Sequence, residues 1–261
     1  MINYPILPFC KGNIIDFNFK IYKIDEKNCE KLVFSFNNYK IKITNSVSEE
    51  NDYIIFGKYK DKYCFICEKN EIDAEFKHIM GNSIPEDIRT IAGIGISTLQ
   101  WNKENKYCGK CGNLLEFLDN EDVAKYCQKC NHIFYPRLNP AIIIAVIKDR
   151  MILVTRKAEW KQGRYGLVAG FIEYGENIEE AAKREVFEET GIKIKNIKYV
   201  ASQFWPFPYQ LMIGLKAEYD DGEIVLDKME LAEAKWLKID DLTPSILPPP
   251  SSIAYFLMKN I

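Results

Sequence analysis

Alternating apolar and polar residues mark the first hundred residues as rich in strands. The segments "KLVFSFNNYKIKI" (31–43) and "YIIFGKYKDKYCFICE" (53–68) carry many aromatic and β-branched residues and are interrupted by short polar turns. This pattern is typical of strands, and it predicts an irregular antiparallel sheet. The next segment, "IPEDIRTIAGIGISTLQWNKENK" (84–106), has the apolar spacing of a helix.

From residue 139 onward, strand patterns alternate with helical ones. An acidic helix is expected between the third and fourth strands, and a last helix is expected to begin near Ser251 or Ser252, after "LPPP". The expected strands are "AIIIAVIKD" (141–149), "MILVTRKA" (151–158), "YGLVAGFIE" (165–173), "IKNIKYVASQF" (194–204) and "QLMIGLKAEY" (210–219).

The acidic helix lies in "GFIEYGENIEEAAKREVFEETGI" (170–192) and has clear end signals. Asn177 is the expected N-cap, with Glu180 reaching back to it as the second half of a capping box. Gly191 is placed where a left-handed C-terminal cap occurs. The helix is therefore expected to run from Ile178 to about Thr190.

The acids of this helix overlap the face that should be apolar. On a helical wheel starting at Ile178, the apolar residues Ala181, Ala182 and Val186 lie at roughly 300°, 40° and 80°. The acids Glu185, Glu188 and Glu189 lie at roughly 340°, 280° and 20°. Acids on a helix usually form a solvated face, but that explanation fails here because the acids share the apolar stripe. Spacings of three and four also make them repel one another, so a positive partner is expected.

Composition and charge are those of a soluble globular protein. The chain has 261 residues, 47% of them hydrophobic and 28% charged, with a net charge of −2 and a pI near 5.9. This balance disfavours a protein that wraps nucleic acid. The start, "MINYPILPFCKG", lacks the pattern of a signal peptide, and "AIIIAVI" is too short to cross a membrane. A cytoplasmic location is expected.

Four of the eight cysteines have the spacing of a zinc ribbon. They form the pattern Cys108-x2-Cys111-x15-Cys127-x2-Cys130, with glycines beside the first pair. A closed site of four thiolates is structural rather than catalytic. Three lysines and four acidic residues lie between the first and last cysteine, so the ribbon is not expected to grip phosphates. His132, in the second knuckle, is expected to cap the ribbon by hydrogen bonding.

The other cysteines are expected to be free thiols. Cys64 and Cys67 in "CFIC" have knuckle spacing, but they lie in an alternating strand with no glycine and no second pair nearby. Cys10 and Cys29 are isolated, and buried free cysteines are common.

The acidic helix predicts a divalent metal site. Magnesium and manganese prefer carboxylate oxygens, and such ions neutralise a pyrophosphate and lower the pKa of water. Glu185 and Glu189 are expected to share an ion, while Glu188 holds a second ion or orients the water. Arg184 is expected to pair with a loop acid such as Glu176.

The same stretch resembles the Nudix box, G-x5-E-x7-R-E-U-x-E-E-x-G-U, at every defined position from Gly170 to Ile192. "SQFWPFP" (202–208) is similar to the S-Q-P-W-P-F-P array of the NADH pyrophosphatase (NudC-type) branch. "YPRLNPAIIIAV" (135–146), the ribbon before it and the tail "ELAEAKW…LPPPSSIA" also resemble that branch. The resemblance covers residues 107–256; Phe204 and Tyr209–Gln210 depart from the branch pattern.

The resemblance implies roles by position. Metal ligation falls to the carbonyl of Ala169 and to the side chains of Glu185, Glu189 and Glu230, with Glu188 in the same cluster. The alternative for Glu230 is that it is a surface glutamate without a role in metal binding. Asp122 aligns with an acidic substrate-contacting position, for which Glu121 is an equal candidate. The other implied substrate-binding residues are Tyr135, Gln203, Phe204, Trp205, Pro206, Phe207, Pro208, Tyr209, Gln210 and Ala254.

The resemblance also implies a fold and an activity. The expected fold is α+β, with a β-rich domain (1–100), a zinc ribbon (107–137) and a Nudix α/β/α sandwich with a mixed sheet (138–261). The expected reaction is hydrolysis of NADH, and of NAD+ less well, to AMP and a nicotinamide mononucleotide, with Mg²⁺ or Mn²⁺ and one structural Zn²⁺. Removal of NAD caps from RNA and homodimerisation are also implied, and no membrane partner is expected. The alternatives are hydrolysis of another nucleoside diphosphate derivative, such as ADP-ribose, or a non-catalytic zinc-ribbon adaptor.

Overall fold

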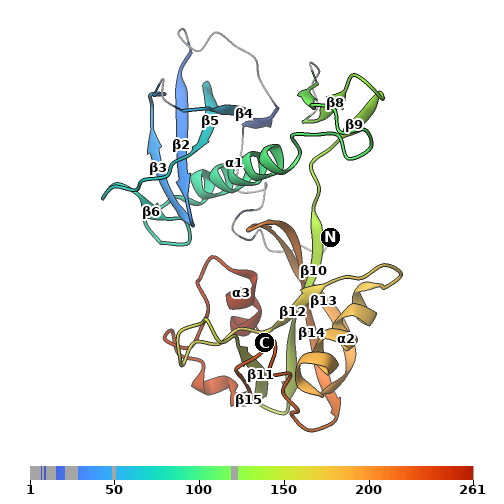
Figure 1. Ribbon diagram of the computed structural model, residues 1–261. Coiled ribbons are helices and arrows are strands. Elements are labelled where there is room, and N and C mark those ends of the chain that lie inside the picture. Colours follow the sequence, from blue (N-terminus) through green and yellow to red (C-terminus); the bar gives the residue numbers. More distant parts are fainter. Residues whose placement is uncertain are drawn as a thin grey trace. The chain divides into compact units, whose positions relative to one another are not determined.

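A computed structural model describes residues 7, 9, 16–20, 29–48, 51–118 and 123–260. The chain divides into two compact units (Figure 1). The N-terminal unit comprises Phe9–Leu138 together with Trp205–Tyr209, and the C-terminal unit includes Asn139–Phe204 and Gln210–Ile261. The ribbon thus belongs to the same unit as the N-terminal sheet, and the expected division into three domains stays a prediction.

The N-terminal unit contains a six-stranded sheet in the order β1-β4-β5-β2-β3-β6. Strands β2 and β3, and strands β4 and β5, form antiparallel hairpins, but β2 pairs with β5 in parallel. The expectation of an antiparallel sheet is therefore wrong at the centre of the sheet, where the two hairpins meet through the parallel pair of β2 and β5. The strands are β1 (Phe17–Phe19), β2 (Lys31–Asn37), β3 (Lys40–Thr44), β4 (Ile54–Tyr59), β5 (Lys62–Glu68) and β6 (Lys77–His78).

The predicted helix is α1 (Glu86–Glu104), which packs on this sheet. Gly95 allows the close approach, because a Cβ there would lie 2.7 Å from Cζ of Phe56 and 3.0 Å from Cδ1 of Ile66. Cys64 and Cys67 are buried free thiols in β5, as expected, and Cys29 is half-buried. Cys10 lies outside the described residues.

The ribbon forms a three-stranded sheet of β7 (Glu116–Phe117), β8 (Lys125–Cys127) and β9 (His132–Phe134). Lys125 is buried and joins the ribbon to the end of α1. Its Nζ donates to the backbone oxygens of Asn102 (3.0 Å) and Asn105 (2.6 Å) and lies over the rings of Trp101 and Phe117. A cation is favourable at a helix C-terminus, so this lysine stabilises the junction within the unit.

The C-terminal unit contains a mixed sheet in the order β13-β14-β10-β11-β15, with β12 also paired to β10. β10 and β14 are parallel, whereas β10 pairs with β11 and β12 in the antiparallel direction. All five expected strands are present. They are β10 (Asn139–Lys148), β11 (Met151–Arg156), β12 (Val168–Phe171), β13 (Lys193–Pro206) and β14 (Tyr209–Asp221), followed by β15 (Glu233–Lys238) and a 3-10 turn, η3 (Ile239–Asp241).

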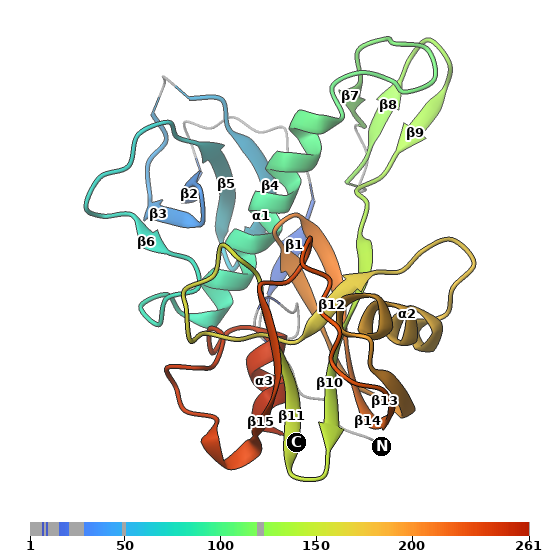
Figure 2. The ribbon, with the colours of Figure 1, turned by 60° about the horizontal axis from the view of Figure 1, so that its bottom comes forward.

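Alternation along β10 sends its side chains to both faces of the sheet. Ile142, Ile144 and Val146 share a core cluster with the apolar face of α2 (Ile178–Thr190). On the other face, Gly214, which pairs with Ile143, lies against Ile253 of α3 (Ile253–Lys259). Figures 1 and 2 show the two helices on opposite sides of this sheet. The predicted α/β/α sandwich with a mixed sheet is confirmed. Within the described residues, no helix combines the length and apolar character needed to cross a bilayer.

Candidate functional site

Helix α2 begins and ends as its end signals predict. The side chain of Asn177 accepts from the backbone N–H of Glu180 (2.8 Å), and the Glu180 carboxylate accepts from the N–H of Asn177 (2.9 Å). Gly191 closes the helix with φ 70°, in the left-handed region. These local contacts fix where each acid of the helix stands.

The three acids differ in burial. Glu189 is only 3% exposed and Glu185 is half-buried, next to the buried Ala181, Ala182 and Val186. Glu188, by contrast, has a side chain that is 58% exposed. Two of the three acids therefore share the apolar face. The expectation that Glu188 also lies on this face is wrong, because its place at the edge of the stripe exposes it.

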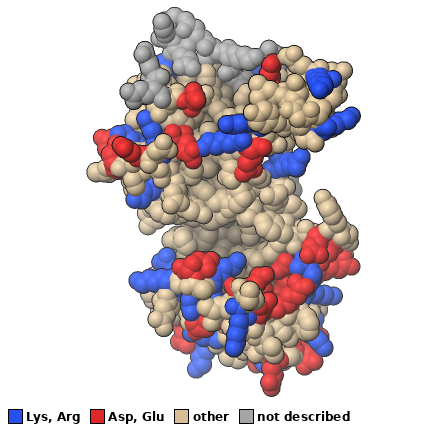
Figure 3. All heavy atoms as spheres, viewed as in Figure 1, with Lys and Arg blue, Asp and Glu red and all other residues tan. Residues whose placement is uncertain are grey.

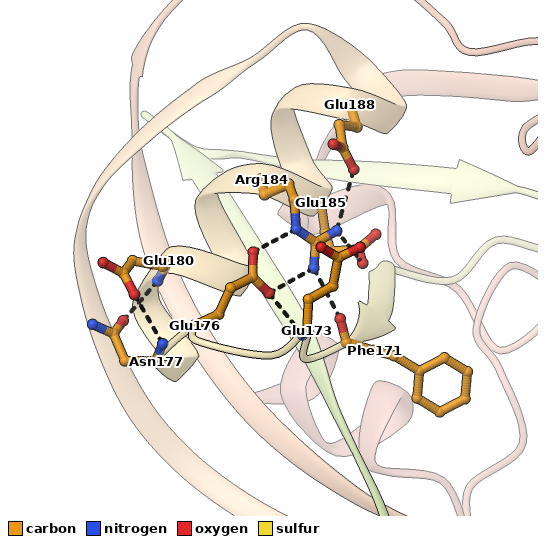
Figure 4. Close-up of polar contacts among 8 residues, drawn as sticks. All are labelled: Phe171, Glu173, Glu176, Asn177, Glu180, Arg184, Glu185 and Glu188. Carbon is orange, nitrogen blue, oxygen red and sulfur yellow. Dashed lines mark hydrogen bonds and ion pairs between the residues drawn. The ribbon is translucent and has the colours of Figure 1, made fainter.

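Arg184 is the positive partner of this acidic group (Figure 4). Its Nε and Nη2 donate to the two oxygens of Glu176 at 2.5 and 2.8 Å. Its Nη1 donates to Glu185 (2.8 Å) and Glu188 (3.2 Å), and Nη2 also donates to the carbonyl of Phe171 (2.9 Å). The predicted brace between Arg184 and Glu176 is confirmed, and the hydrogen bonds from Arg184 lower the pKa of Glu176 to about 2.

Glu189 has no such partner. Its Oε1 is buried, and no hydrogen bond reaches it from the described residues. Burial raises the pKa of Glu189 to about 8, and the charges of Glu185 and Glu230 act in the same direction. Burial also raises the pKa of Glu185, although Arg184 opposes that shift. A buried carboxylate oxygen without a partner is costly, which makes this atom a natural ligand for a cation.

Gly170 leaves room for the carboxylate of Glu185. A Cβ at this position would lie 1.9 Å from Cδ and 2.0 Å from Oε1 of Glu185. Gly170 and Ala169 lie on β12, paired with Ile142 and Ile143 of β10. Strand β12 therefore lies directly against Glu185, and the role of the Ala169 carbonyl stays a prediction.

Glu230 is brought to the same place from far along the chain. The N–H of Asp227 donates to the carbonyl of Glu189 (3.1 Å), and a turn from Asp227 follows, closed by the N–H groups of Glu230 (3.3 Å) and Leu231 (2.9 Å). The charge of Glu230 raises the pKa of both Glu185 and Glu189. Glu230 therefore stands close to the acids of α2, which favours its predicted role over that of an unrelated surface acid.

The acids fit a divalent cation by their chemistry and by the space around them. They supply hard oxygen donors, one of which is buried and unpartnered. They are not drawn together around a point, however, because Glu185 and Glu188 turn to Arg184. Within the part of the chain that the structure describes, the four cysteines are the one group of three or more metal-ligating side chains that meet within 4.8 Å. Figure 3 shows acidic side chains gathered on the side of the unit that carries α2.

Two charged residues near this site were not among the site residues predicted from the sequence. Asp227 raises the pKa of Glu189 and Lys157 lowers it, both through their charge. Asp227 lies three residues before Glu230, and Lys157 follows the last residue of β11. Their positions relative to the acidic cluster, rather than any motif, identify them.

The four cysteines Cys108, Cys111, Cys127 and Cys130 form the second candidate site. The Sγ atoms of Cys108 and Cys130 are 3.5 Å apart, and those of Cys111 and Cys127 are 3.4 Å apart. These distances are far longer than a disulfide bond. Backbone N–H groups donate to the thiols, including that of His132 to Cys130. The cluster suits a single metal ion with four sulfur ligands, and His132 contributes through its backbone as well as by ring contact with Phe134.

The predicted substrate residues are divided between the two units. Gln203 is fully buried, where its amide donates to the carbonyl of Ser251 (2.9 Å) and accepts from the N–H of Ile253 (2.7 Å). It holds the start of α3, next to Ala254, so its buried side chain has a positioning role, and its place in the substrate pocket stays a prediction. Phe204 and Gln210 are half-buried in the C-terminal unit.

The rest of the aromatic array belongs to the N-terminal unit. Trp205 and Phe207 pack edge to face at 5.7 Å, and Phe207 also packs against Tyr39 at 4.6 Å. The hydroxyl of Tyr209 donates to Glu104, whereas Pro206 is buried and Pro208 is exposed. Tyr135, in the same unit, is 55% exposed and available for stacking. Asp122 and its alternative Glu121 lie outside the described residues.

Comparisons with known proteins point to one family. A family model described as NUDIX domain matches residues 137–256. The NAD-capped RNA hydrolase NudC of Escherichia fergusonii is 40% identical over 194 residues, which are 72% of this chain and 74% of that protein. The NAD-capped RNA hydrolase NudC of Escherichia coli strain SMS-3-5 is 43% identical over 170 residues, 65% of each chain. This chain thus spans about two thirds of the length of these relatives.

Among solved structures, a NUDIX hydrolase from Nitrosomonas europaea is 22% identical, with a TM-score of 0.47 over 52% of this chain and 80% of that chain.

Proposed function

Because the chain belongs to the NudC branch of the Nudix hydrolases, we propose that it hydrolyses the pyrophosphate bond of NADH and NAD+. The products are AMP and a nicotinamide mononucleotide. The proposal includes removal of the NAD cap from RNA, the activity named for the Escherichia relatives. The observation that carries it is the buried, unpartnered Oε1 of Glu189 beside Glu185 and Glu230.

The acids are proposed to hold Mg²⁺ or Mn²⁺. The proposed ligands are the side chains of Glu185, Glu189 and Glu230 and the carbonyl of Ala169, with Glu188 at the exposed edge. A divalent cation bound there neutralises a diphosphate and activates water for attack on phosphorus. The donor set supports these ions, since carboxylate and carbonyl oxygens are the ligands that both prefer.

The residues of the chain prepare the site for this chemistry. Arg184 holds Glu185 and Glu188 while Glu176 fixes the guanidinium, so the acids are oriented before any substrate arrives. Glu188 is exposed and able to accept a proton from the attacking water. The apolar residues around Glu189 on α2 keep bulk water away from its carboxylate, which strengthens the charge interactions of that group.

We also propose that the cysteine cluster holds one structural Zn²⁺. Four ligands at about 2.3 Å from a tetrahedral zinc ion lie roughly 3.8 Å apart, close to the paired sulfur distances of 3.4 and 3.5 Å. The buried free thiols of Cys64 and Cys67 favour a reducing compartment such as the cytoplasm. A homodimer is proposed from the family alone.

For the substrate, we propose that Tyr135 stacks on a base and that the residues from Phe204 to Gln210 and the backbone of Ala254 line the pocket. This role is supported by the exposed ring of Tyr135, because an aromatic side chain can stack on any nucleic acid base. Asp122 or Glu121 stays a proposed acidic contact.

The test is turnover of NADH, ADP-ribose and NAD-capped RNA with Mn²⁺, measured side by side. We expect NADH and capped RNA to be cleaved faster than ADP-ribose. Glu189→Gln is expected to abolish cleavage while circular dichroism and thermal unfolding stay close to wild type. Preference for ADP-ribose would refute the nicotinamide assignment, and unaltered turnover in Glu189→Gln would refute the metal site. No cleavage of any substrate, with metal bound, would favour a non-catalytic adaptor.

A further inference from the structure

Arg184, the arginine of the acidic site, is not available to a substrate. Arg184 is fully engaged with Glu176, Glu185, Glu188 and the carbonyl of Phe171. A diphosphate carries negative charge of its own, and it would approach a group of carboxylates that already repel one another. A second positive side chain at the rim would reduce that repulsion.

Lys157 is placed at this rim by the backbone. The N–H of Ala232 donates to the carbonyl of Arg156 (2.9 Å), where β11 ends and β15 begins. The segment before Ala232 contains Glu230 and is tied at its other end to the carbonyl of Glu189 through Asp227. Lys157, the next residue after Arg156, therefore lies beside the segment that links Glu230 to Glu189, and its charge acts on Glu189.

The backbone of Lys157 is held, whereas its ammonium group is not. Its carbonyl accepts from Nη1 of Arg156 (3.2 Å) and from the N–H of Trp160 (3.1 Å). In the described part of the chain, no hydrogen bond or ion pair involves its Nζ. The neighbouring cations are engaged elsewhere, because Arg156 pairs with Glu233 (3.4 Å) and Lys235 donates to Tyr165 (2.7 Å).

We propose that Lys157 is a substrate-contacting residue that binds the diphosphate of the dinucleotide at the edge of the acidic site. This inference rests on the proposed function and extends it by a residue outside the Nudix box. Lys157 is half-buried and its backbone is fixed by two hydrogen bonds, and a lysine ammonium binds a phosphate as a point charge. The competing explanation is that Lys157 only balances the charge of Glu189.

The first measurement is the steady-state kinetics of Lys157→Met, which keeps the aliphatic stem and removes the charge. We expect kcat/KM for NADH to fall roughly 10- to 100-fold, the usual effect of losing one charged hydrogen bond. Lys157→Arg should restore most of the loss. Lys161→Met, an exposed lysine of the same loop, is the matched control and should stay within about twofold of wild type.

The second measurement separates the two explanations by calorimetry. If Lys157 binds diphosphate, Lys157→Met weakens binding of ADP by a similar factor in the presence of Mn²⁺ and leaves the affinity for Mn²⁺ alone almost unchanged. If it only balances Glu189, the variant binds Mn²⁺ more tightly and ADP equally well, which would overturn the proposal.

The ADP titration also keeps this inference distinct from the proposed function. Wild-type protein that binds ADP but cleaves no dinucleotide contradicts the proposed function, while the loss of ADP affinity in Lys157→Met still supports the contact. Wild-type protein that binds no ADP, or a variant that binds ADP as well as wild type, would overturn the contact itself.

Discussion

Gly170 is the single residue on which the geometry of the acids depends most directly. The Nudix box requires a glycine at this position, and the structure supplies the reason. The carboxylate of Glu185 occupies the space where any side chain would begin. The glycine is thus needed for the close approach of a strand to an acid, and not for an unusual backbone angle.

The corresponding prediction is that Gly170→Ala separates activity from stability. The added methyl group displaces the flexible end of Glu185 from Arg184, so unfolding should change by no more than about 1 kcal/mol. Cleavage of NADH should fall about 100-fold, because misplacement by about 1 Å is enough to cost that much. Urea unfolding and steady-state kinetics measure the two effects. Wild-type turnover would show that Glu185 does not need its present position.

Two short helices illustrate different degrees of predictability. Helix α2 could be predicted to the residue, because its capping box and terminal glycine act within four residues of the chain. Helix α3 starts at a predicted serine cap, Ser252, but its attachment could not be predicted. It depends on Gln203, which is about fifty residues away in sequence. Glutamine is usually exposed in folded proteins, so its burial here could not be predicted.

We therefore expect Gln203→Ala to destabilise the C-terminal unit by about 2–4 kcal/mol, because two buried hydrogen bonds to the start of α3 are lost. Urea denaturation followed by tryptophan fluorescence measures the change. Gln210→Ala, at a half-buried position on β14, is the control and should cost less than about 1 kcal/mol. Equal effects of the two substitutions would contradict the positioning role of Gln203.

The contrast between local and long-range contacts also explains the other features that could not be predicted from the sequence. Alternation predicted the N-terminal strands, but not the parallel pairing of β2 and β5, since register between distant strands leaves no local signal. Glu230 was found only through resemblance. Lys157 and Asp227 have no pattern of their own and were identified by their charge effect on Glu189 and by backbone contacts between segments distant in sequence.

At the scale of the whole molecule, the ribbon is the part expected to depend on a metal, because its core is small. Its buried cluster holds Cys108, Leu115 and Cys127, packed against Cys111, Cys130 and Phe134. So small a core is insufficient for independent stability, and structural zinc supplies folding free energy in such units. The Nudix sheet, by contrast, has a core cluster of twelve buried residues.

Removal of the metal should accordingly act on the ribbon alone. Cys127→Ala is expected to lose the one zinc ion per chain and to expose residues 107–134 to rapid hydrogen exchange, while β10 and β14 stay protected. Cys67→Ala removes a buried free thiol of similar size and should retain the zinc. Mass spectrometry of exchange and metal analysis provide the measurements. Full zinc occupancy in Cys127→Ala would contradict the assignment of the cluster.

The hairpin between β13 and β14 has a consequence for any attempt to shorten the protein. A fragment beginning at Asn139 contains the whole Nudix sheet, yet it separates Trp205 and Phe207 from Phe9 and Tyr39, the rings they pack against. Such a fragment would expose the aromatic side chains of the hairpin to solvent and would tend to aggregate. Expression of the catalytic half alone thus calls for polar replacements at the hairpin tip rather than a simple cut.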